Sequence, residues 1–518
     1  MTRVLLTADR TLMSDYRGKE FLGFGTSAPP YVLPPWLYQR LFFPPVRRRR
    51  GLPAEAPYGL RKVEARLIMD GYDVVTVDPD HLPRYIADAD VLGVHTMDPF
   101  GLGPSSSTFT KILKRGDPFL ARCFRAIFEL TEVKIAKRRG LKILVGGPGA
   151  WQFEVRGEAF AEYGIDCALI GEAENVIGRL VGRLANGEAV PRVYRARLDE
   201  TPSLDEIAEI RQPSINGLVE IGRGCPRGCA FCDTTLRPLR WYPYDKIERE
   251  LAVNSEADLR GGILHGEDVL LYGSSNTTPV RERVIRLHQL AKKYMTTFCW
   301  SHTSMAAVAA DKHLIGEVAD IILGDSQTWW GAEIGIETGS PRLLRKVMPA
   351  KAHPFKPEEW PEVVKTAAGL MTDNKLFPAC TLISGLPEES EEDVYATLDL
   401  IDDLRGFRAF IIPLFFVPLG RLKEKDWFKL EDLTDLQKEL FVRCFNHDLR
   451  WAKEMMDLYF TGDRWGWLVK KAFSLFLWML KRYVAREGVT LIPEAPPRSA
   501  RAIEPPALHP LLTQHSKA

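Results

Sequence analysis

Three cysteines lie within eight consecutive residues, in the segment Gly224-Cys-Pro-Arg-Gly-Cys-Ala-Phe-Cys232. The spacing C-x3-C-x2-C, on a loop with two glycines and a proline, lets three thiolates converge on one inorganic site. Structural zinc takes four closed ligands, commonly in paired C-x2-C groups. Here the next cysteine, Cys299, is 67 positions further on, and no histidine follows Cys232 within 30 residues. This pattern favours a [4Fe–4S] cluster with one iron left open, with zinc and unrelated surface thiols as alternatives.

A series of strands and helices surrounds the cysteine segment, from about residue 216 to residue 420. Helices are expected over 244–254, 279–294 and 361–374. Strands are expected over 217–221, 269–272, 297–301, 332–336, 377–383 and 410–417. Six strand–helix alternations fit a partial (β/α) barrel as well as an open sheet, and periodicity does not separate the two.

The cysteine segment resembles the signature of the radical S-adenosylmethionine (SAM) superfamily, including the aromatic Phe231 before the third cysteine. Three further segments match motifs of that superfamily in its order. They are His265-Gly-Glu-Asp268, expected on the second strand, Gly335-Ile-Glu-Thr-Gly-Ser340, and Ser384-Gly-Leu-Pro-Glu388, where Glu388 replaces the usual second glycine. The resemblance implies that residues 216–420 form a partial (β/α)6 radical SAM barrel.

The resemblance also implies roles for individual residues. Cys225, Cys229 and Cys232 would bind the [4Fe–4S] cluster, whose open iron would be chelated by SAM. A carboxylate, Glu267 or Asp268, would hold the SAM ammonium group. Further SAM contacts are implied for Phe231, Ser301 and Glu337, although Ser301 could equally be a satisfied polar group at the barrel rim. A flavodoxin- or ferredoxin-like electron donor would supply the reducing electron.

Residues 1–190 are expected to form a separate α/β domain. Strands are expected over 3–7, 72–77, 91–95, 142–145 and 167–171, with helices over 60–71 and 174–184. Short strands alternating with helices indicate a doubly wound parallel sheet, which binds ligands at the carboxyl ends of its strands. Those ends carry Asp98–Thr108, Gly146–Gly149 and Gly171–Glu174, which could also be ordinary turns.

This first domain is similar to the Rossmann-like cobalamin-binding domain of the B12-dependent branch of the superfamily. The similarity implies cobalamin contacts from seven residues, which are Ser105, Ser106, Ser107, Gly146, Gly147, Gly171 and Glu172. The D-x-H-x-x-G motif, whose histidine ligates cobalt in many such domains, is absent from residues 8–14. His81 and His95 have the wrong context to replace it. The domain could therefore hold cobalamin without a lower histidine ligand, or be empty.

The remaining segments are an insertion, a linker, a helical domain and a tail. The insertion 28–53 is rich in proline and contains Arg47–Arg50, which favours a solvated loop over a site for an anion. A linker is expected over 191–215, a helical domain over 421–490 and a disordered tail over 491–518. In the helical domain Thr434–Gln437 is a capping box, and Trp465–Tyr483 mixes aromatic and basic residues as core helices and interfacial helices do.

Composition narrows the remaining choices. The chain has 518 residues and a formal net charge of +1, which argues against a nucleic-acid partner. No signal peptide and no window of 18 uncharged apolar residues is present, so a cytoplasmic protein is expected, with peripheral membrane contact through the C-terminal helices as an option. The other cysteines, Cys123, Cys167, Cys299, Cys380 and Cys444, are expected to be buried and inert.

These features lead to one principal functional hypothesis and its alternatives. We expect a radical SAM enzyme that methylates an unactivated carbon of a small-molecule or lipid substrate with the help of cobalamin. Radical carbon–carbon bond formation or cyclisation without methyl transfer is the first alternative. A non-catalytic sensor of redox state, SAM or cobalamin is the second. Methylthio transfer is disfavoured because it would use further N-terminal cysteines.

Overall fold

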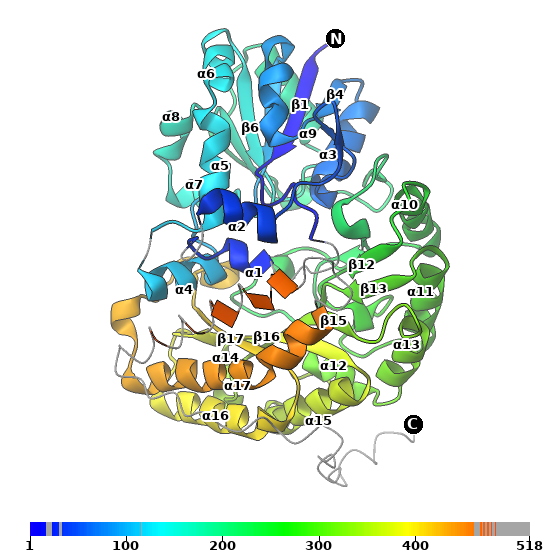
Figure 1. Cartoon of the computed structure of the whole chain (residues 1–518), viewed down its shortest axis with the longest axis vertical. Coiled ribbons are helices and arrows are strands. Elements are labelled where there is room, and N and C mark those ends of the chain that lie inside the picture. The colour runs from blue at the N-terminus through cyan, green and yellow to red at the C-terminus, as the bar shows by residue number, and fades with distance from the viewer. Residues whose placement is uncertain are drawn as a thin grey trace. The chain divides into compact units, whose positions relative to one another are not determined.

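The computed structural model describes residues 1–16, 23–30, 34–114 and 116–459, together with positions 467, 468, 470, 471, 474, 475, 478 and 482. The chain forms two compact units. Unit 1 comprises Met1–Glu220, Tyr242–Ile263 and Lys293–Thr296. Unit 2 comprises Ile221–Trp241, Leu264–Lys292 and Thr297–Ala518. Figure 1 shows the elements of both units with their labels.

Unit 1 contains a six-stranded parallel sheet of order β4–β1–β5–β6–β7–β8. Its strands are β1 (Arg3–Ala8), β4 (Asp73–Thr76), β5 (Val91–His95), β6 (Lys142–Gly146), β7 (Cys167–Ile170) and β8 (Val193–Arg195). The helices along this part of the chain are α3 (Tyr58–Met69), α4 (Pro104–Leu113), α5 (Phe119–Glu129), α6 (Thr131–Arg138), α7 (Gln152–Val155), α8 (Ala159–Tyr163) and α9 (Ile177–Ala185). The predicted doubly wound α/β fold is confirmed. β8 lies in the segment expected to be a linker.

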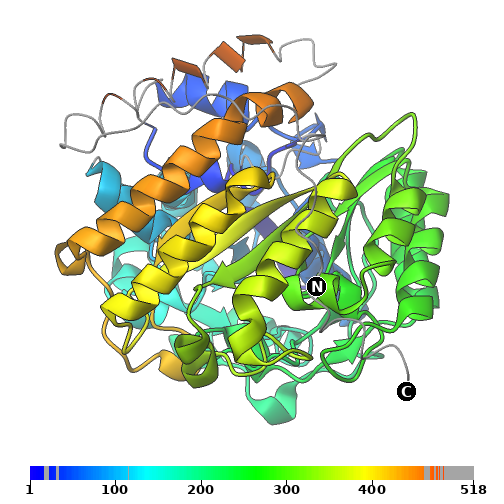
Figure 2. The same cartoon turned by 90° about the horizontal axis from the view of Figure 1, so that it is seen from below.

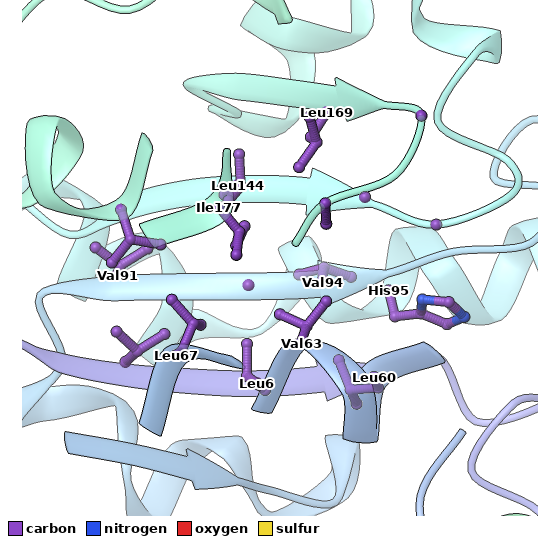
Figure 3. Close-up of a pocket in the computed structure, with 17 residues that line it drawn as sticks. Leu6, Leu60, Val63, Leu67, Val91, Val94, His95, Leu144, Leu169 and Ile177 are labelled. Carbon is purple, nitrogen blue, oxygen red and sulfur yellow. The ribbon is translucent and has the colours of Figure 1, made fainter. Parts of the chain in front are cut away.

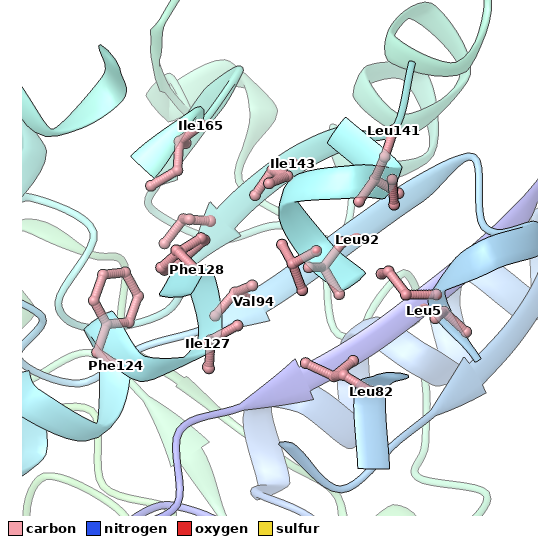
Figure 4. Packing of buried hydrophobic residues seen from close by; sticks show 14 of the residues in the cluster. Leu5, Leu82, Leu92, Val94, Phe124, Ile127, Phe128, Leu141, Ile143 and Ile165 are labelled. Atoms are coloured by element: carbon pink, nitrogen blue, oxygen red, sulfur yellow. The ribbon is translucent and has the colours of Figure 1, made fainter. Parts of the chain in front are cut away.

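Helices cover both faces of this sheet because the strands are apolar on both sides. Along β1, Leu5 belongs to the hydrophobic cluster under α5 and α6, whereas Val4 and Leu6 belong to the cluster under α3 and α9. Figure 4 shows the first cluster, in which Leu5 and Leu92 of the strands pack with Phe124, Ile127 and Phe128. Near-continuous apolar strands of this kind are typical of a buried parallel sheet.

The described part of the insertion forms short helical and strand segments, and its four arginines are exposed, as expected of a solvated loop. Its elements are α2 (Pro35–Phe42), β2 (Arg48–Arg49) and β3 (Leu52–Pro53), and α1 (Gly23–Thr26) lies shortly before it. Pro35 starts α2 at the first helical position, where the missing N–H costs nothing. The Arg48 guanidinium lies 2.8 Å from Asp78 Oδ1 and 3.1 Å from Asp80 Oδ2. The Arg48 side chain is therefore paired with two acidic residues that follow β4.

The second α/β series forms two sheets, of order β13–β12–β9 and β14–β15–β16–β17. The strands are β9 (Leu218–Glu220), β12 (Gly261–His265), β13 (Thr297–Trp300), β14 (His302–Thr303), β15 (Trp330–Glu337), β16 (Leu376–Ser384) and β17 (Phe410–Phe415), with a short β10 (Gly222–Arg223) and β11 (Arg240–Trp241) pair. β13 and β14 are pieces of one strand interrupted at Ser301. Six strand positions result, as expected of a partial (β/α)6 barrel.

Helices accompany these strands, and Figure 2 shows the yellow and orange helices running side by side along the four-stranded sheet. They are α10 (Tyr244–Glu256), α11 (Arg281–Tyr294), α12 (Met305–Ala310), α13 (Leu314–Ile322), α14 (Pro341–Val347), α15 (Trp360–Asp373) and α16 (Glu391–Asp403). Buried Ile334, Cys380 and Ile411 are partners or next neighbours on adjacent strands. They form the helix-covered face, which leaves the other face to carry polar chemistry.

One predicted strand is wrong. Residues 269–272 are not in a strand, because Val269–Leu271 is a 3-10 helix, η7, and the second strand is β12 instead. All three side chains of η7 are fully buried. A short run of apolar residues indicates that the segment is buried, but its periodicity does not distinguish a buried strand from a buried helical turn. Glu267 and Asp268, which were expected on the second strand, therefore lie in the loop directly after β12.

The C-terminal part that the structure describes is dominated by α17 (Asp435–Tyr459). Its predicted capping box is present, since Gln437 N donates to Thr434 Oγ1 and Thr434 N donates to Gln437 Oε1. Cys444, Trp451 and Met455 are buried along one side of it. Most of Trp465–Tyr483 and all of 491–518 lie outside the described residues. Among the residues described, no helix has the length and apolar character needed to cross a bilayer.

Candidate metal centre

The cysteine segment is a tight loop between β10 and the 3-10 helix η6 (Asp233–Leu236). Gly224 and Gly228 have φ of +84° and +63°, and a Cβ on Gly224 would lie 2.5 Å from the carbonyl oxygen of Pro238. These two positions therefore require glycine. The loop is fixed by backbone hydrogen bonds from Cys232 N to Cys229 O (3.2 Å) and from Ala230 N to Val347 O (2.8 Å).

The three thiols are not surface groups. Cys229 is 7% exposed, and Cys225 and Cys232 are half-buried. Burial raises the pKa of Cys225 to about 12 and also raises the pKa of the other two thiols. Each raised pKa reflects the cost of placing a thiolate charge away from water, so ionised sulfurs here require a positive centre beside them. The geometry fits a buried metal group and removes the interpretation of the cysteines as unrelated surface thiols.

The loop also fits a cluster in its donor set. Cys225 and Cys232 each interact electrostatically with their cysteine neighbours in the loop, which places the three sulfurs in one small region. Among the described residues, no three His, Cys, Asp or Glu side chains converge on a single point where one metal ion could sit. In a [4Fe–4S] cluster each thiolate binds a different iron, so the sulfurs surround the group without meeting at one centre.

Asp268 is buried and surrounded by protein donors. Thr303 donates to its Oδ1 at 2.9 Å, and Ser304 donates to its Oδ2 at 2.5 Å. The Arg227 guanidinium donates to Oδ2 from Nε at 3.4 Å and from Nη2 at 3.3 Å. With four donors and 2% exposure, this carboxylate is occupied by the protein itself.

Glu267, the other candidate for the SAM ammonium group, is half-buried next to Asp268 and accepts no hydrogen bond from the residues that the structure describes. Its charge acts on Cys232 and on His302. Ser301 differs from it, because its hydroxyl donates to Gly266 O and accepts from Gly266 N, both at 3.1 Å. Of these three side chains, Glu267 is therefore the one that can meet a ligand cation.

Glu337 ends β15 in a left-handed conformation, with φ of +67°. Its Oε1 accepts from Lys351 Nζ at 3.0 Å and its Oε2 accepts from Thr381 Oγ1 at 3.2 Å, in a setting where Glu337 and Lys351 are 7% and 8% exposed. The carboxylate folds back over Gly335, where any Cβ would overlap with it. The conformation of Glu337 thus explains the glycine two residues before it in the motif.

The Ser384–Glu388 segment has the geometry of a glycine-rich turn. Gly385 has φ of +81° and Glu388 has φ of +65°. Glu388 therefore adopts the conformation that the usual glycine would adopt without strain. Its exposed carboxylate pairs with Lys346. The neighbouring Glu389 accepts from Gly385 N at 2.9 Å and from Gln437 at 2.6 Å, and burial raises its pKa to about 7.

Unit 1 contains an apolar pocket between one face of its central strands and helices α3 and α9, which extends from Val4 and Val91 to the glycines at the carboxyl ends of the strands (Figure 3). Leu6, Leu144 and Leu169 line it from the sheet, and Leu60 and Ile177 from α3 and α9. Its polar edge is formed by His95, whose pKa burial lowers to about 4, so the imidazole is neutral at neutral pH. Four glycines, Gly93, Gly146, Gly147 and Gly171, complete the lining.

The seven residues predicted to contact cobalamin divide into two groups. Gly146, Gly147 and Gly171 line the pocket, and a Cβ on Gly147 would lie 2.7 Å from both His95 Nδ1 and Thr96 O. The other four do not line it. Ser105, Ser106 and Ser107 lie in the first turn of α4, and Glu172 is half-buried after β7. The hydroxyls of Ser106 and Thr96 are buried, and no hydrogen-bond partner for either lies among the described residues.

Several side chains of the site were missed from the sequence. Arg227 lies inside the cysteine segment and could have been noticed there. Lys351, Thr303, Ser304 and Thr381 carry no local signal, because their importance comes from contacts with residues distant in the sequence. The dispersed cysteines agree with expectation in part, since Cys167, Cys380 and Cys444 are buried whereas Cys123 and Cys299 are half-buried.

Residues 219–401 match the sequence profile of the radical SAM superfamily. The matched range contains the cysteine loop, β12, β15 and β16, which carry the four motifs described above. This segment of the chain is a radical SAM domain. A domain of that superfamily implies a [4Fe–4S] cluster and SAM as cofactors, as predicted.

Particular relatives are more distant. A tRNA-2-methylthio-N(6)-dimethylallyladenosine synthase of Chlorobium limicola is 25% identical over 288 residues, covering 54% of this chain and 61% of the relative. A synthase of the same name from Thermotoga petrophila is 24% identical over 286 residues, which cover 54% of this chain and 59% of the relative. An uncharacterized methyltransferase of Pyrococcus horikoshii is 24% identical over 322 residues. For the first and second of these relatives, the match spans less than two thirds of their own length.

Among solved structures, the chain is similar to the radical S-adenosylmethionine methyltransferase TsrM from Kitasatospora setae, determined with cobalamin and a [4Fe–4S] cluster bound. The TM-score is 0.52 at 15% identity, over 82% of this chain and 77% of TsrM. A second structure of TsrM, with tryptophan substrate and a SAM analogue, gives 0.51. At this identity the likeness concerns the fold, and it extends beyond the radical SAM domain into unit 1.

Proposed function

We propose that this protein is a radical SAM enzyme that binds a [4Fe–4S] cluster through Cys225, Cys229 and Cys232. The observation that carries the proposal is the buried cysteine loop, held directly beside an acidic pair in which Asp268 is hydrogen-bonded and Glu267 has no donor among the residues that the structure describes. A protein that only binds a cluster, and does not bind SAM, would not need a second carboxylate without a protein donor next to the thiols. This distinction favours an enzyme over a non-catalytic sensor.

The acidic side chains around the cysteine loop would have different roles in binding SAM. When bound, the cluster supplies one electron to SAM, which yields methionine and a 5′-deoxyadenosyl radical. Glu267 would hold the SAM ammonium group, because a partly buried carboxylate favours a cation over water. Asp268 would fix the loop that carries Glu267. Glu337 would face the ribose with its remaining lone pairs while Lys351 and Thr381 hold its orientation.

We further propose that unit 1 binds cobalamin. The pocket of Figure 3 is apolar and reaches the carboxyl ends of the parallel strands, where such sheets bind their ligands and where glycines border it. The neutral His95 and the unsatisfied hydroxyl of Thr96 offer polar contacts beside it. The likeness of fold to TsrM, which was determined with cobalamin, supports the same assignment.

The reaction we propose is methylation of an unactivated carbon, with cobalamin carrying the methyl group. Radical carbon–carbon bond formation or cyclisation is the alternative if no cobalamin is retained. We do not propose methylthio transfer, in spite of the names of several relatives. The N-terminal residues 1–220 hold only Cys123 and Cys167, on α5 and β7, and burial raises the pKa of both thiols. For partners we propose a flavodoxin- or ferredoxin-like electron donor and a small-molecule or lipid substrate.

Anaerobic reconstitution with iron, sulfide, SAM and dithionite tests the first proposal. We expect formation of 5′-deoxyadenosine, and an intact cluster without this product would contradict the enzyme assignment. Reconstitution with hydroxocobalamin, followed by cobalt analysis and visible spectroscopy, tests the second. Val63→Trp would fill the pocket from α3 and should abolish cobalt retention. Met69→Trp, an exposed position on the same helix, is the matched control and should retain cobalt.

A further inference from the structure

Arg227 is a buried guanidinium within the cysteine loop, two residues after Cys225 and two before Cys229. Its side chain is 4% exposed. The two halves of its planar head contact different parts of unit 2. On one side Nε and Nη2 donate to Asp268 Oδ2, and on the other side Nη1 donates to the carbonyl oxygens of Lys351 at 2.9 Å and His353 at 3.0 Å.

The Asp268 side of this arrangement continues into the strand that follows. Asp268 also accepts from Thr303 and Ser304, and Ser304 in turn accepts from Ala307 N and so caps α12. The carboxylate therefore joins the loop after β12 to the end of β14 and the start of the next helix. Arg227 supplies the only cationic donor among the four side-chain hydrogen bonds described for Asp268, so its removal would leave a buried carboxylate without a counter-charge.

The carbonyl side continues into the loop after α14. A third carbonyl, that of Ala350, lies 3.3 Å from Nη1, so three of the four carbonyl oxygens of residues 350–353 lie around one nitrogen. The same loop carries Lys351, whose Nζ lies 3.0 Å from Glu337 Oε1. Holding the backbone of this loop fixes the origin of the Lys351 side chain and, through it, the carboxylate of Glu337.

The chemistry of the contact requires arginine. A guanidinium offers five N–H donors in a rigid plane, so that one head can serve a carboxylate and a set of carbonyls on opposite sides. A lysine ammonium is a point charge with three donors and cannot reach both sides in the same way. The alternative interpretation, a purely structural arginine that neutralises Asp268, does not account for the three carbonyl oxygens at the opposite nitrogen.

We infer that Arg227 is a positioning residue that holds the cluster loop in place relative to the two carboxylates proposed to contact SAM. It positions Glu267 through its contact with Asp268, and it positions Glu337 through the loop that carries Lys351. The inference rests on the proposed radical SAM function. It assigns to Arg227 the relative placement of the cluster and its SAM, and not the binding of iron. The cysteines alone would hold the cluster, whereas productive chelation of SAM depends on the arginine.

The test compares Arg227→Gln, Arg227→Lys and Asp268→Asn with the wild type in full-length reconstituted protein. Iron and sulfide contents, the KM and kcat for SAM in 5′-deoxyadenosine formation, and the change in the electron paramagnetic resonance spectrum of the reduced cluster on adding SAM are measured. We expect unchanged iron in Arg227→Gln, a KM for SAM raised by about tenfold or more, and loss of the SAM-induced spectral change. Arg227→Lys should not restore the wild-type KM.

Two controls give the result its meaning. Arg421→Gln removes another guanidinium that donates to the cysteine loop, at Gly228 O (3.2 Å), but touches neither Asp268 nor residues 350–353. It should behave as wild type. Asp268→Asn should raise the KM in the same direction, and the double variant should be no worse than the worse single variant because both act through one contact.

Three outcomes would overturn the inference. Arg227→Gln with wild-type KM would show that the contact does not position SAM, and loss of iron would show that it serves cluster assembly instead. An Arg227→Lys variant with wild-type KM would show that charge alone suffices. None of these coincides with failure of the proposed function, which would be a wild-type protein that holds its cluster and forms no 5′-deoxyadenosine.

Discussion

Lys351 Nζ lies 3.0 Å from Glu337 Oε1, and both side chains are almost completely buried. Such a pair is costly to break from one side, because the remaining charge stays in a region from which water is excluded. The partners come from different elements, the end of β15 and the loop after α14. Their contact therefore depends on the relative position of the end of β15 and the loop after α14.

Replacing Lys351 with methionine should lower the stability of the protein. Glu337 would keep its Thr381 contact but lose its counter-charge, for an expected cost of about 3 kcal/mol. The midpoint of chemical unfolding measures this change. Lys346→Met is the matched control, since its partner Glu388 is exposed and the expected cost is below about 1 kcal/mol. Equal effects of the two substitutions would contradict the difference in burial.

Replacing Glu388 with glycine should stabilise the protein. Glu388 has φ of +65°, and glycine adopts this conformation without the strain that a Cβ causes. We expect a gain of about 1 kcal/mol, reduced by a few tenths for the lost pair with Lys346. Thermal unfolding measures the gain. Glu391→Gly, at the first position of α16, should bring no gain. A destabilised Glu388→Gly variant would show that the strain is offset elsewhere.

The stability of the protein should depend on pH through Glu389. Burial raises the pKa of its carboxyl group to about 7 from an ordinary value of 4.5, so between these values the folded state binds the extra proton. Stability from this group is therefore greatest at low pH and falls as the pH rises from 4.5 through 7.

Glu389→Gln removes that loss. The variant should match the wild type at pH 5 and exceed it by about 1 to 2 kcal/mol at pH 8, after allowance for partial solvent contact. Unfolding midpoints at the two pH values measure the difference. Glu388→Gln is the control, because the Lys346 contact lowers the pKa of Glu388 and no gain at pH 8 is expected. A gain by Glu389→Gln that is the same at both pH values would refute titration as its cause.

Replacing Cys229 with alanine should remove the cluster and all formation of 5′-deoxyadenosine, because no other cysteine lies in the loop between Cys225 and Cys232. Iron analysis and the visible absorption of the reconstituted protein measure the first effect. Cys123→Ala, on α5 of unit 1, is the control and should keep both cluster and activity. SAM cleavage that survives in Cys229→Ala would refute the assignment of the ligands.

Much of the fold followed from the sequence because its signals are local. The strands of unit 1 alternate with helices over short intervals, and the expected positions of β1, β4, β5, β6 and β7 agree with the structure within two residues. The strand expected over 269–272 failed because a fully buried 3-10 turn has the same composition as a buried strand. The pairing of Arg48 with Asp78 and Asp80 carried no local signal, because these partners lie 30 or more residues further along the chain.

The site divides in the same way. The sequence by itself determined the cysteine loop, since the spacing of three thiolates and the glycines that shape their turn are adjacent residues. It left Glu267 and Asp268 as equal candidates for the SAM ammonium group. Only the tertiary structure distinguishes the two side chains, because Thr303, Ser304 and Arg227 reach Asp268 across 35, 36 and 41 positions of the chain. Donors distant in sequence form hydrogen bonds with the carboxylate of Asp268, whereas the carboxylate of Glu267 accepts none from the described residues.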